Sequence, residues 1–407
     1  MNEGSIVRPD CEIEETRFKF VITTQHEGVE ATTAIHTQDF ERRIGGARFV
    51  DKGNLTEVAR LSSTMTAKCL AAMIPADGQK SLIVTGGKPL SEERRAQILI
   101  EHVRVLKTVD PGVIIGPDMK NAEPIQDLAA LADGLLDHFT GLSRANRGLE
   151  IDANGYTAHG VVAAIRACMD DVSLRGKRVT IQGFGAVGAH AARLLGEAGA
   201  IVVGVNNKDV LFTDGDGLDI PSLFDFAHRY GDENLKNYQN SSGSFEVSSR
   251  PDDIFEVPTD IFIPAGRTGV LATADELEHA RVENRDVRDV ADFYAATGVS
   301  LIAEGANCPL SRGAEHWLES KGVRILPDFI ANCGGLIGCW VEWEARHKYG
   351  LKPAIDLEAV GHQALVRIRR TVTENVRELL RSELTAREAA EEIGRRNRAR
   401  LLASRRN

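Results

Sequence analysis

The stretch that most restricts the fold of this chain runs from Arg178 to Val205. A strand-like segment (178–182) leads directly into Gly183-Phe-Gly185-Ala-Val-Gly188, and a helix rich in small residues (189–200) and a second apolar strand (201–205) follow. In this setting the first glycine makes the turn, the second lets backbone N–H groups reach a pyrophosphate, and the third lets helix and strand pack closely. The sequence therefore predicts a parallel βαβ unit that binds a dinucleotide through Gly183, Gly185, Ala186, Val187 and Gly188.

The end of the second strand bears on the choice between NAD and NADP. An acidic residue commonly binds the ribose 2′-hydroxyl of NAD at this point. This chain has Asn206, Asn207 and Lys208, which suit a 2′-phosphate at least as well, although Asp209 is close enough to serve NAD. The sequence leaves the preference open, with a slight lean to NAD or dual use.

Length, charge and cysteine usage set the broad class. A chain of 407 residues is too long for one ordinary domain, and its net charge of -10 argues against nucleic acid as the main partner. There is no apolar run long enough to span a bilayer and no signal-peptide pattern in the first twenty residues, so a cytoplasmic protein is expected. Six scattered cysteines form no CxxC pair, which predicts reduced thiols and no metal site.

Two lysines and an aspartate stand out upstream of the glycine turn. Lys68 lies near the end of a predicted helix (55–73), and Lys80 precedes an apolar strand (82–84). Asp118 follows another predicted strand (112–115) within three residues, at the carboxyl end where open α/β sheets gather ligands. One lysine can pair with a substrate carboxylate, and a second, partly desolvated lysine can have its pKa lowered enough to act as a base.

The order of predicted elements indicates an α/β protein with two lobes. We expect an α/β domain for substrate binding and oligomerisation (1–150), completed by a helical tail (344–407), and a Rossmann-type, doubly wound dinucleotide-binding domain (151–343). The first seventeen residues are expected to be frayed, and one helix is expected over 124–139.

With these features in order, the chain resembles the glutamate/leucine/phenylalanine/valine dehydrogenase family. The resemblance covers residues 18–343. It is carried by short motifs, which are Ala34-Ile-His, Gly45-Gly-Ala-Arg48, Met65-Thr-Ala-Lys68, Gly116-Pro-Asp118, Thr157-Ala-His-Gly160, Glu304-Gly-Ala-Asn307 and Pro327-Asp-Phe-Ile-Ala-Asn332-Cys-Gly-Gly335.

The resemblance implies roles for individual residues. Lys68 matches the lysine that pairs with the substrate carboxylate, Lys80 the general base, and Asp118 the carboxylate that carries a proton to and from the substrate nitrogen. Asn332 matches a residue near substrate and nicotinamide. Further cofactor contacts are implied for Thr157, Ala265 and Asn307, and the family also suggests a homo-oligomer.

The resemblance also bears on the substrate. Members that act on glutamate are similar to one another in a lysine before the Gly-Gly-x-Arg stretch and a serine seven residues after the asparagine that matches Asn332; here these positions hold Ile44 and Cys339. Neither pairs with a second carboxylate, and burying one unpaired is costly. Ile44, Leu336 and Cys339, with Gly116 leaving space beside them, predict a pocket for a hydrophobic and even aromatic L-amino acid, which an NAD(P)-dependent oxidoreductase would convert to its 2-oxo acid.

One departure from the family keeps other interpretations open. The family usually has a run of glycines before the catalytic lysine, whereas this chain reads Asp77-Gly78-Gln79-Lys80. Asp77 in particular could pair with Lys80 and raise its pKa. A diverged enzyme acting on an unusual amine or imine, and a nucleotide-binding paralogue without activity, therefore remain as alternatives. The physiological substrate, the direction of flux and the oligomer size stay open.

Overall fold

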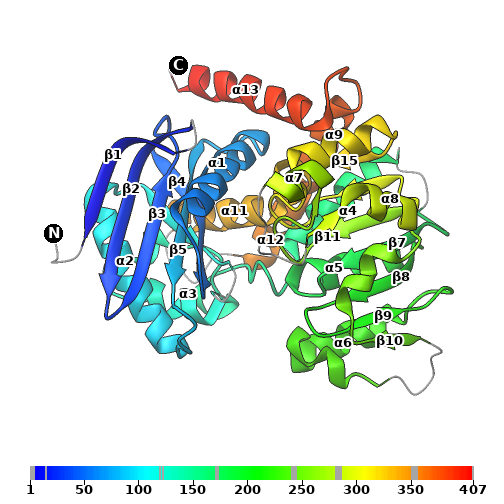
Figure 1. The fold of residues 1–407 in the computed structure, drawn as a ribbon. Coiled ribbons are helices and arrows are strands. Elements are labelled where there is room, and N and C mark those ends of the chain that lie inside the picture. Colours follow the sequence, from blue (N-terminus) through cyan, green and yellow to red (C-terminus); the bar gives the residue numbers. More distant parts are fainter. Residues whose placement is uncertain are drawn as a thin grey trace. The chain divides into compact units, whose positions relative to one another are not determined.

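The computed structural model describes residues 5–13, 16–118, 121, 123–169, 174–239, 245–279, 287–349 and 356–405. The chain forms two compact units (Figure 1). Unit 1 comprises residues 1–154, 335–367 and 391–407, and unit 2 comprises residues 155–334 and 368–390. The whole tail (344–407) is predicted from the sequence to complete the first domain, whereas residues 368–390 group with unit 2 in the structure.

Unit 1 is built on a mixed sheet of six strands. Their spatial order is β1 (Ile6–Ile13), β2 (Thr16–His26), β3 (Val29–Ile35), β5 (Ala76–Val84), β4 (Arg42–Val50) and β6 (Val113–Gly116). The first four pair antiparallel, and β4 runs parallel to β5 and β6. The expectation of a frayed start is wrong for β1, because residues 6–13 pair with β2 along their whole length.

Helices cover both faces of this sheet. Helix α1 (Leu55–Ala71) packs against β5 and β3, with Val58 and Ala59 in one apolar cluster with Leu82. Helices α2 (Glu92–Val109) and α3 (Glu123–Ala130) join a larger cluster that contains Phe49 and Ile83. Since successive side chains of a strand point to opposite faces, Lys80 shares the face of Leu82, toward α1.

Two sequence predictions about helices had different outcomes. Asn54 is the N-cap of α1, as predicted, and its side chain accepts a hydrogen bond from the backbone N–H of Glu57. The single helix predicted over 124–139 is wrong. Helix α3 ends at Ala130, Gly134 adopts a positive φ of 71°, and a short 3-10 helix, η1 (Leu136–His138), follows. A second 3-10 turn, η2 (Arg144–Asn146), lies further along the same connection.

Unit 2 confirms the Rossmann-type, doubly wound fold. Its sheet has the order β10 (Glu246–Ser248), β9 (Leu211–Thr213), β8 (Ile201–Asn206), β7 (Arg178–Gln182), β11 (Ile261–Pro264), β14 (Leu301–Ala303) and β15 (Arg324–Leu326). The five strands from β8 to β15 are parallel, and β9 and β10 are antiparallel at one edge. Strand order reverses between β7 and β11, where sheets of this kind bind ligands.

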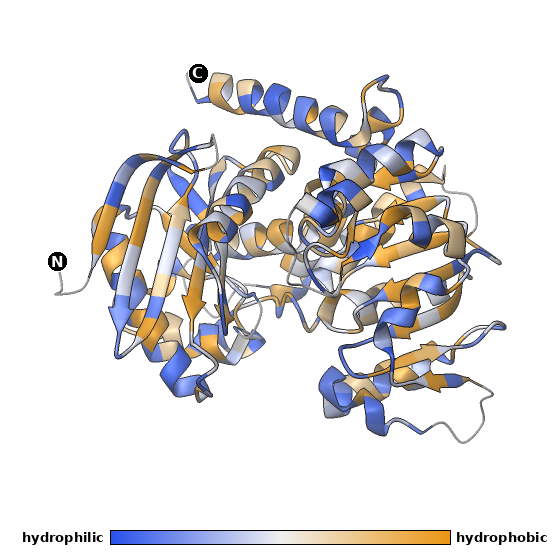
Figure 2. Ribbon diagram, viewed as in Figure 1, coloured by the Kyte–Doolittle hydropathy of each residue, from blue (hydrophilic) through white to orange (hydrophobic). Residues whose placement is uncertain are grey.

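The remaining elements of unit 2 are helices, 3-10 turns and a small strand pair. They are α4 (Tyr156–Cys168), α5 (Ala186–Glu197), α6 (Ile220–Tyr230), η3 (Asp232–Asn237), η4 (Pro251–Glu256), β12 (Leu271–Ala272), α7 (Ala274–His279), β13 (Arg288–Asp289), α8 (Val290–Thr297), α9 (Arg312–Ser320) and α10 (Asp328–Ala331). The strands of both sheets are predominantly hydrophobic, and much of the outward helical surface is hydrophilic (Figure 2). No helix in the described ranges has the length and apolar character needed to cross a membrane.

The C-terminal helices are shared between the units. Helix α11 (Gly334–Tyr349) lies almost wholly in unit 1, whereas α12 (Leu357–Leu379) and α13 (Ala386–Ser404) each contribute residues to both. Within unit 1, Leu401 packs with Phe40 and Leu70. The Asn397 side-chain amide donates to the Leu70 carbonyl at 3.0 Å. The end of α13 is thus an integral part of unit 1.

At its other end, α13 places Arg387 inside unit 2. The guanidinium donates to the carboxylates of Glu304 at 2.8 Å, Glu315 at 2.8 Å and Asp328 at 3.0 Å. All four side chains are buried. Burial raises the pKa of the Glu304 carboxyl, and the charge of Arg387 opposes that rise. A buried charge set of this kind is stable only while every member is present.

We expect Arg387→Met to destabilise the protein by about 3 kcal/mol or more, since three carboxylates would lose their shared cation. Urea unfolding followed by circular dichroism measures this. The control is Arg395→Met on the same helix, because Arg395 pairs with Glu392 at the surface and its removal should cost less than about 1 kcal/mol. Equal losses in the two variants would contradict the structural role given to Arg387.

Candidate active site

The centre of the unit 1 sheet brings Lys80 and Asp118 together. Lys80 lies within β5 and is almost fully buried, and its Nζ forms an ion pair with Oδ2 of Asp118. Asp118 follows β6 by two residues, and its backbone is fixed by reciprocal hydrogen bonds with that of Asn121 at 2.8 and 3.2 Å. The Asn121 side chain in turn donates to the Ala47 carbonyl of β4. The pair is therefore held from three adjacent strands.

Two further cations belong to this group. The Nε of Arg48, on β4, donates to the other carboxylate oxygen of Asp118 at 3.3 Å, a contact that the sequence analysis did not predict. Lys68 is buried in the last turn of α1. Burial lowers the pKa of Lys80, the Asp118 carboxylate raises it, and the positive charges of Arg48 and Lys68 lower it. Lys68 and Lys80 are thus close enough to influence each other's charge.

The glycine pair of β4 is required by close packing around these groups. A Cβ at Gly45 would lie 1.7 Å from the Gln79 carbonyl oxygen. One at Gly46 would lie 2.9 Å from Cβ of Asp118 and from the Pro117 carbonyl oxygen. Side chains at either position would push β4 away from β5 or displace Asp118, which explains the motif in physical terms.

The altered residues before Lys80 belong to a strand that begins earlier than the sequence predicts, at Ala76 and not at Leu82. Asp77, Gly78 and Gln79 all lie inside β5 and are buried. Asp77 accepts hydrogen bonds from the Thr37 hydroxyl at 2.5 Å and the Phe40 backbone N–H at 2.8 Å. Gln79 donates to carbonyls of β4 and β6, at Gly45 and Ile114. Strand alternation turns Asp77 and Gln79 away from Lys80, so both serve to fix the sheet.

An apolar wall lies beside the charged group. An added Cβ at Gly116 would lie 3.7 Å from Sγ of Cys339 and 3.7 Å from a methyl carbon of Thr140. Leu336 and Cys339 are three residues apart on α11 and both are buried. Ile44 is buried on β4, where it pairs with Ile114 in β6, two residues before Gly116. The structure thus brings Gly116 and Cys339 together and adds Thr140, which the sequence analysis missed.

Glu342 holds this wall in place. Its buried carboxylate accepts hydrogen bonds from the backbone N–H groups of Gly141 and Leu149, both at 2.8 Å, and from the Arg346 guanidinium at 2.6 Å. The Thr140 hydroxyl donates to the Cys339 carbonyl at 2.7 Å. The connection after β6, which from its composition looks like a flexible joint, is therefore bound tightly to α11.

In unit 2, the glycine turn has the geometry that its sequence predicts. Gly183 has a φ of 95°, and a Cβ there would lie 2.4 Å from Cα of Gly266 in the loop after β11. A Cβ at Gly188 would lie 1.8 Å from the Gly183 carbonyl oxygen, so helix α5 packs directly on the turn. Ala265 is in the same loop as Gly266. The turn therefore lies where the strand order reverses. Gly185 is the N-cap residue of α5, and an added Cβ there would come no closer than 3.7 Å to a neighbouring atom, which leaves space for a ligand beside the first backbone N–H groups of the helix.

The two asparagines at the end of β8, Asn206 in the strand and Asn207 directly after it, form hydrogen bonds within the protein. Asn206 accepts from the Gly183 backbone N–H at 2.8 Å and donates to the Pro251 carbonyl at 2.7 Å. Asn207 accepts from two backbone N–H groups that follow it and donates to the Asp232 carbonyl at 2.7 Å. These bonds brace the turn and the end of β8.

A second set of polar residues gathers around Asn332. Its side-chain amide donates to the Ala306 carbonyl at 2.9 Å and to Oδ1 of Asn307 at 3.3 Å. Its own Oδ1 is buried, with no hydrogen-bond partner in the described ranges. A Cβ at Gly334 would lie 2.1 Å from the Tyr156 carbonyl oxygen, which places the first turn of α4, with Thr157, against this segment. An unsatisfied acceptor here suits the amide N–H₂ of a nicotinamide.

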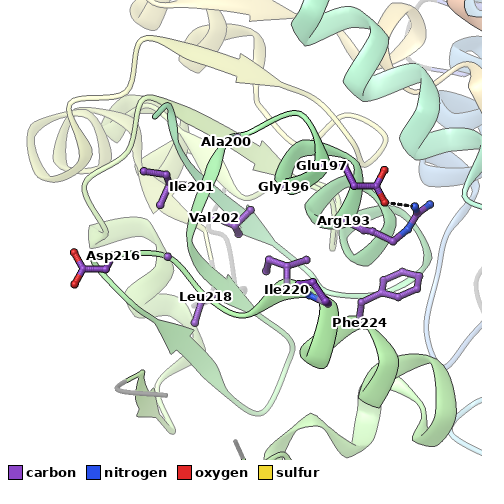
Figure 3. A pocket seen from close by; sticks show the side chains of 12 residues that line it. Arg193, Gly196, Glu197, Ala200, Ile201, Val202, Asp216, Leu218, Ile220 and Phe224 are labelled. Carbon is purple, nitrogen blue, oxygen red and sulfur yellow. Dashed lines mark hydrogen bonds and ion pairs between the residues drawn. The ribbon is translucent and has the colours of Figure 1, made fainter. Parts of the chain in front are cut away.

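Unit 2 also contains a pocket of about 610 Å³ away from the glycine turn (Figure 3). It is lined by Arg193 and Glu197 of α5, by Ile201 and Val202 at the start of β8, and by Phe224 of α6. The glycine turn is at the opposite end of the parallel strands. The described residues contain no group of three or more His, Cys, Asp and Glu side chains arranged to hold a metal ion. All six cysteines lie in the described ranges, and none of them forms a disulfide there.

Substitutions of Asp77 and Asp118 should have different effects on the pKa of Lys80. We expect Asp118→Asn to lower the pKa of Lys80, because it removes the carboxylate that raises it. We expect Asp77→Asn to leave that pKa in place and to reduce the free energy of unfolding by about 1–3 kcal/mol, because a buried acceptor is lost.

The measurement is an NMR pH titration of the Lys80 Cε resonance, assigned by its loss in Lys80→Arg, together with urea unfolding. A downward shift of the Lys80 pKa in Asp77→Asn as large as that in Asp118→Asn would show that Asp77 faces the lysine.

The chain is similar to known proteins over most of its length. The family model described as "Glutamate/Leucine/Phenylalanine/Valine dehydrogenase" matches residues 148–402, and that described as "Glu/Leu/Phe/Val dehydrogenase, dimerisation domain" matches residues 14–130. The chain is 28% identical over 353 residues to the mitochondrial glutamate dehydrogenase of Dictyostelium discoideum. That alignment covers 80% of this chain and 65% of the relative, which is less than two thirds of the relative's length.

Solved structures of this kind share the fold. The leucine-bound hetero-hexameric glutamate dehydrogenase of Thermus thermophilus has a TM-score of 0.73 at 23% identity, covering 98% of this chain and 88% of that one. The L-tryptophan dehydrogenase of Nostoc punctiforme has a TM-score of 0.58 at 20% identity, covering 94% of this chain and 96% of that one.

Proposed function

Because the chain belongs to the glutamate/leucine/phenylalanine/valine dehydrogenase family, we propose that it catalyses the NAD(P)-dependent, reversible oxidative deamination of a hydrophobic L-amino acid. The products are the 2-oxo acid and ammonia. The observation that carries the proposal is the ion pair between the buried Lys80 and Asp118, with Lys68 close by and an apolar wall next to it. Charged groups supply the chemistry, and the wall selects the side chain.

Each charged group has a distinct task. Lys68 binds the α-carboxylate of the amino acid, which orients the α-carbon. Asp118 accepts a proton from the substrate amine and stabilises the positive charge that develops on nitrogen. When bound, NAD(P) would supply the acceptor for the hydride that leaves the α-carbon. Lys80 then removes a proton from the water that adds to the imine carbon, a step that needs a neutral amine and is favoured by the lowered pKa of this buried lysine.

Arg48 is a positioning residue in this scheme. It binds the Asp118 oxygen that does not face Lys80. The carboxylate is thereby held through both of its oxygens. A carboxylate held in this way is available to the substrate amine without reorganisation.

The residues of unit 2 fit the cofactor. The open backbone at Gly185 and the following turn of α5 suit a pyrophosphate. The buried, unsatisfied Oδ1 of Asn332 suits the carboxamide of a nicotinamide. The remaining residues of the proposed cofactor site belong to the same two groups of segments. They are Gly183, Ala186, Val187, Gly188, Thr157, Ala265 and Asn307.

The proposed substrate of this chain differs from glutamate, the amino acid for which many of the similar proteins are named. Glutamate dehydrogenases are prominent among the similar proteins, yet the wall contains Ile44, Leu336 and Cys339. A thiol has no cationic form, and burial raises the pKa of the Cys339 thiol well above its ordinary value, so Cys339 stays neutral and provides no positive charge for a second carboxylate. A glutamate side chain would be buried there without a cation, at a cost of several kcal/mol.

The assembly and its location are further proposals. The match of residues 14–130 to a model described as a dimerisation domain supports a homo-oligomer formed through unit 1. The number of subunits and a cytoplasmic location stay predictions.

The substrate proposal is tested by NAD(P)H absorbance with a panel of L-amino acids. We expect kcat/KM for the best apolar substrate to exceed that for glutamate at least about a hundredfold, since a buried unpaired carboxylate costs about 3 kcal/mol or more. The double variant Ile44→Lys/Cys339→Ser should gain glutamate turnover and lose apolar turnover, and Lys80→Ala should abolish both. Preference of the wild-type enzyme for glutamate would overturn the pocket proposal, and cofactor binding without turnover of any amine would favour the inactive paralogue.

The space at Gly116 gives a finer prediction. A methyl group there meets its neighbours at 3.7 Å, an ordinary van der Waals contact, so Gly116→Ala should fold normally. We expect it to raise KM for phenylalanine and tryptophan about tenfold while changing KM for valine less than about twofold, because only a large side chain needs the lost volume. The control is Gly196→Ala, in unit 2, where the added Cβ meets no atom within 4 Å. A uniform change for all substrates would show that Gly116 does not line the pocket.

A further inference from the structure

The end of β8 lacks the acidic residue that commonly binds the ribose of NAD, and the structure offers one from another element. Asp232 is the first residue of η3, directly after the Gly231 that ends α6. Its carbonyl accepts the side-chain amide of Asn207 at 2.7 Å, so η3 is tied to the end of β8. Asp232, which comes 47 positions after Gly185 in the sequence, is thereby fixed at the place where a nucleotide ribose is expected.

The carboxylate of Asp232 points to the glycine turn. A Cβ at Gly185 would have a single neighbour within 4 Å among the atoms of the described chain, Oδ2 of Asp232 at 3.7 Å. The Asp232 residue is exposed. The space beside the second glycine is therefore open and bounded by one accessible carboxylate, which is the acceptor that a ribose hydroxyl requires.

The charges around Asp232 determine whether this site favours NAD or NADP. Glu233 follows Asp232 and folds back, with both carboxylate oxygens 2.5 Å from where a Cβ on Gly231 would be. Two adjacent carboxylates repel a 2′-phosphate and leave a 2′-hydroxyl unaffected. Lys208 is exposed on the neighbouring turn, and its charge acts on Asp232. This lysine is the group that a 2′-phosphate would use if Asp232 were neutral.

We propose that Asp232, and not an acidic residue at the end of β8, binds the adenosine ribose and makes this chain prefer NAD over NADP. The inference rests on the cofactor role of unit 2 and not on the proposed amino-acid substrate. The other candidate for this role is Asp209, which follows β8 and whose backbone N–H donates to the side-chain oxygen of Asn207 at 2.8 Å.

The test is direct binding, without substrate, measured by the fluorescence of NADH and NADPH. We expect Asp232→Asn to weaken NADH about tenfold, the loss typical of a hydrogen bond to a charged acceptor, and to strengthen NADPH about tenfold by removing repulsion. Asp209→Asn is the matched control and should leave both dissociation constants within about twofold of wild type. Adding Lys208→Ala to Asp232→Asn should cancel the gain for NADPH.

Competition by 5′-AMP and adenosine 2′,5′-bisphosphate confines the same comparison to the ribose end of the cofactor. Thermal unfolding checks that each variant is folded. A loss of NADH affinity in Asp209→Asn but not in Asp232→Asn would overturn the inference, as would a wild-type chain that binds the two cofactors equally. A chain that binds neither dinucleotide would overturn the proposed function as well.

Discussion

A lysine ammonium in the middle of a sheet loses almost all of its hydration, and in unit 1 the carboxylate of Asp118 compensates for this loss at Lys80. Much of the local structure follows from bringing the two together. Strand β6 stops two residues before Asp118, Asn121 fixes the backbone of that segment, and Gly46 has no side chain that would occupy the space of the carboxylate. Arg48 takes the second oxygen. The same interaction sets the chemistry, since burial and two nearby cations lower the pKa of Lys80 while Asp118 opposes them.

Unit 2 also contains a buried cation whose loss of hydration is compensated by carboxylates. Arg387 is buried with three carboxylates, and two of them belong to the segments that contain Asn307 and Asn332. Asp328 also accepts the backbone N–H of Cys308 at 2.9 Å, and Glu304 accepts that of Asp328 at 2.7 Å. The charge cluster thus fixes the backbone on either side of the amides proposed to contact the cofactor. Their positions depend on packing and charge well outside the glycine turn.

The sequence predicted the features that depend on short-range patterns. The glycine turn, the N-cap at Asn54 and the α/β order are local, and the structure confirms each of them. The sequence did not show the direction of Asp77, because whether it faces Lys80 depends on where β5 begins, and the strand starts at Ala76 instead of after Lys80. It missed Thr140, Glu342 and Arg387, because each acts on a partner 59 or more residues away, or across a connection whose composition resembles a flexible loop. Asp232, the proposed ribose ligand, was missed for a different reason, because the expected position for a ribose ligand is at the end of β8.

The division of the tail has a consequence for how the protein is made. Unit 1 takes residues from the beginning of the chain and again from 335–367 and 391–405, and unit 2 takes residues 368–390 for itself. On the ribosome, the first 154 residues emerge long before the segments that cover Leu70, Phe40 and the loop at Gly141. Unit 1 must therefore remain incomplete, with apolar surface exposed, while nearly the whole of unit 2 is synthesised. The nascent chain should depend on chaperones during this interval more than a protein whose domains follow one another in sequence.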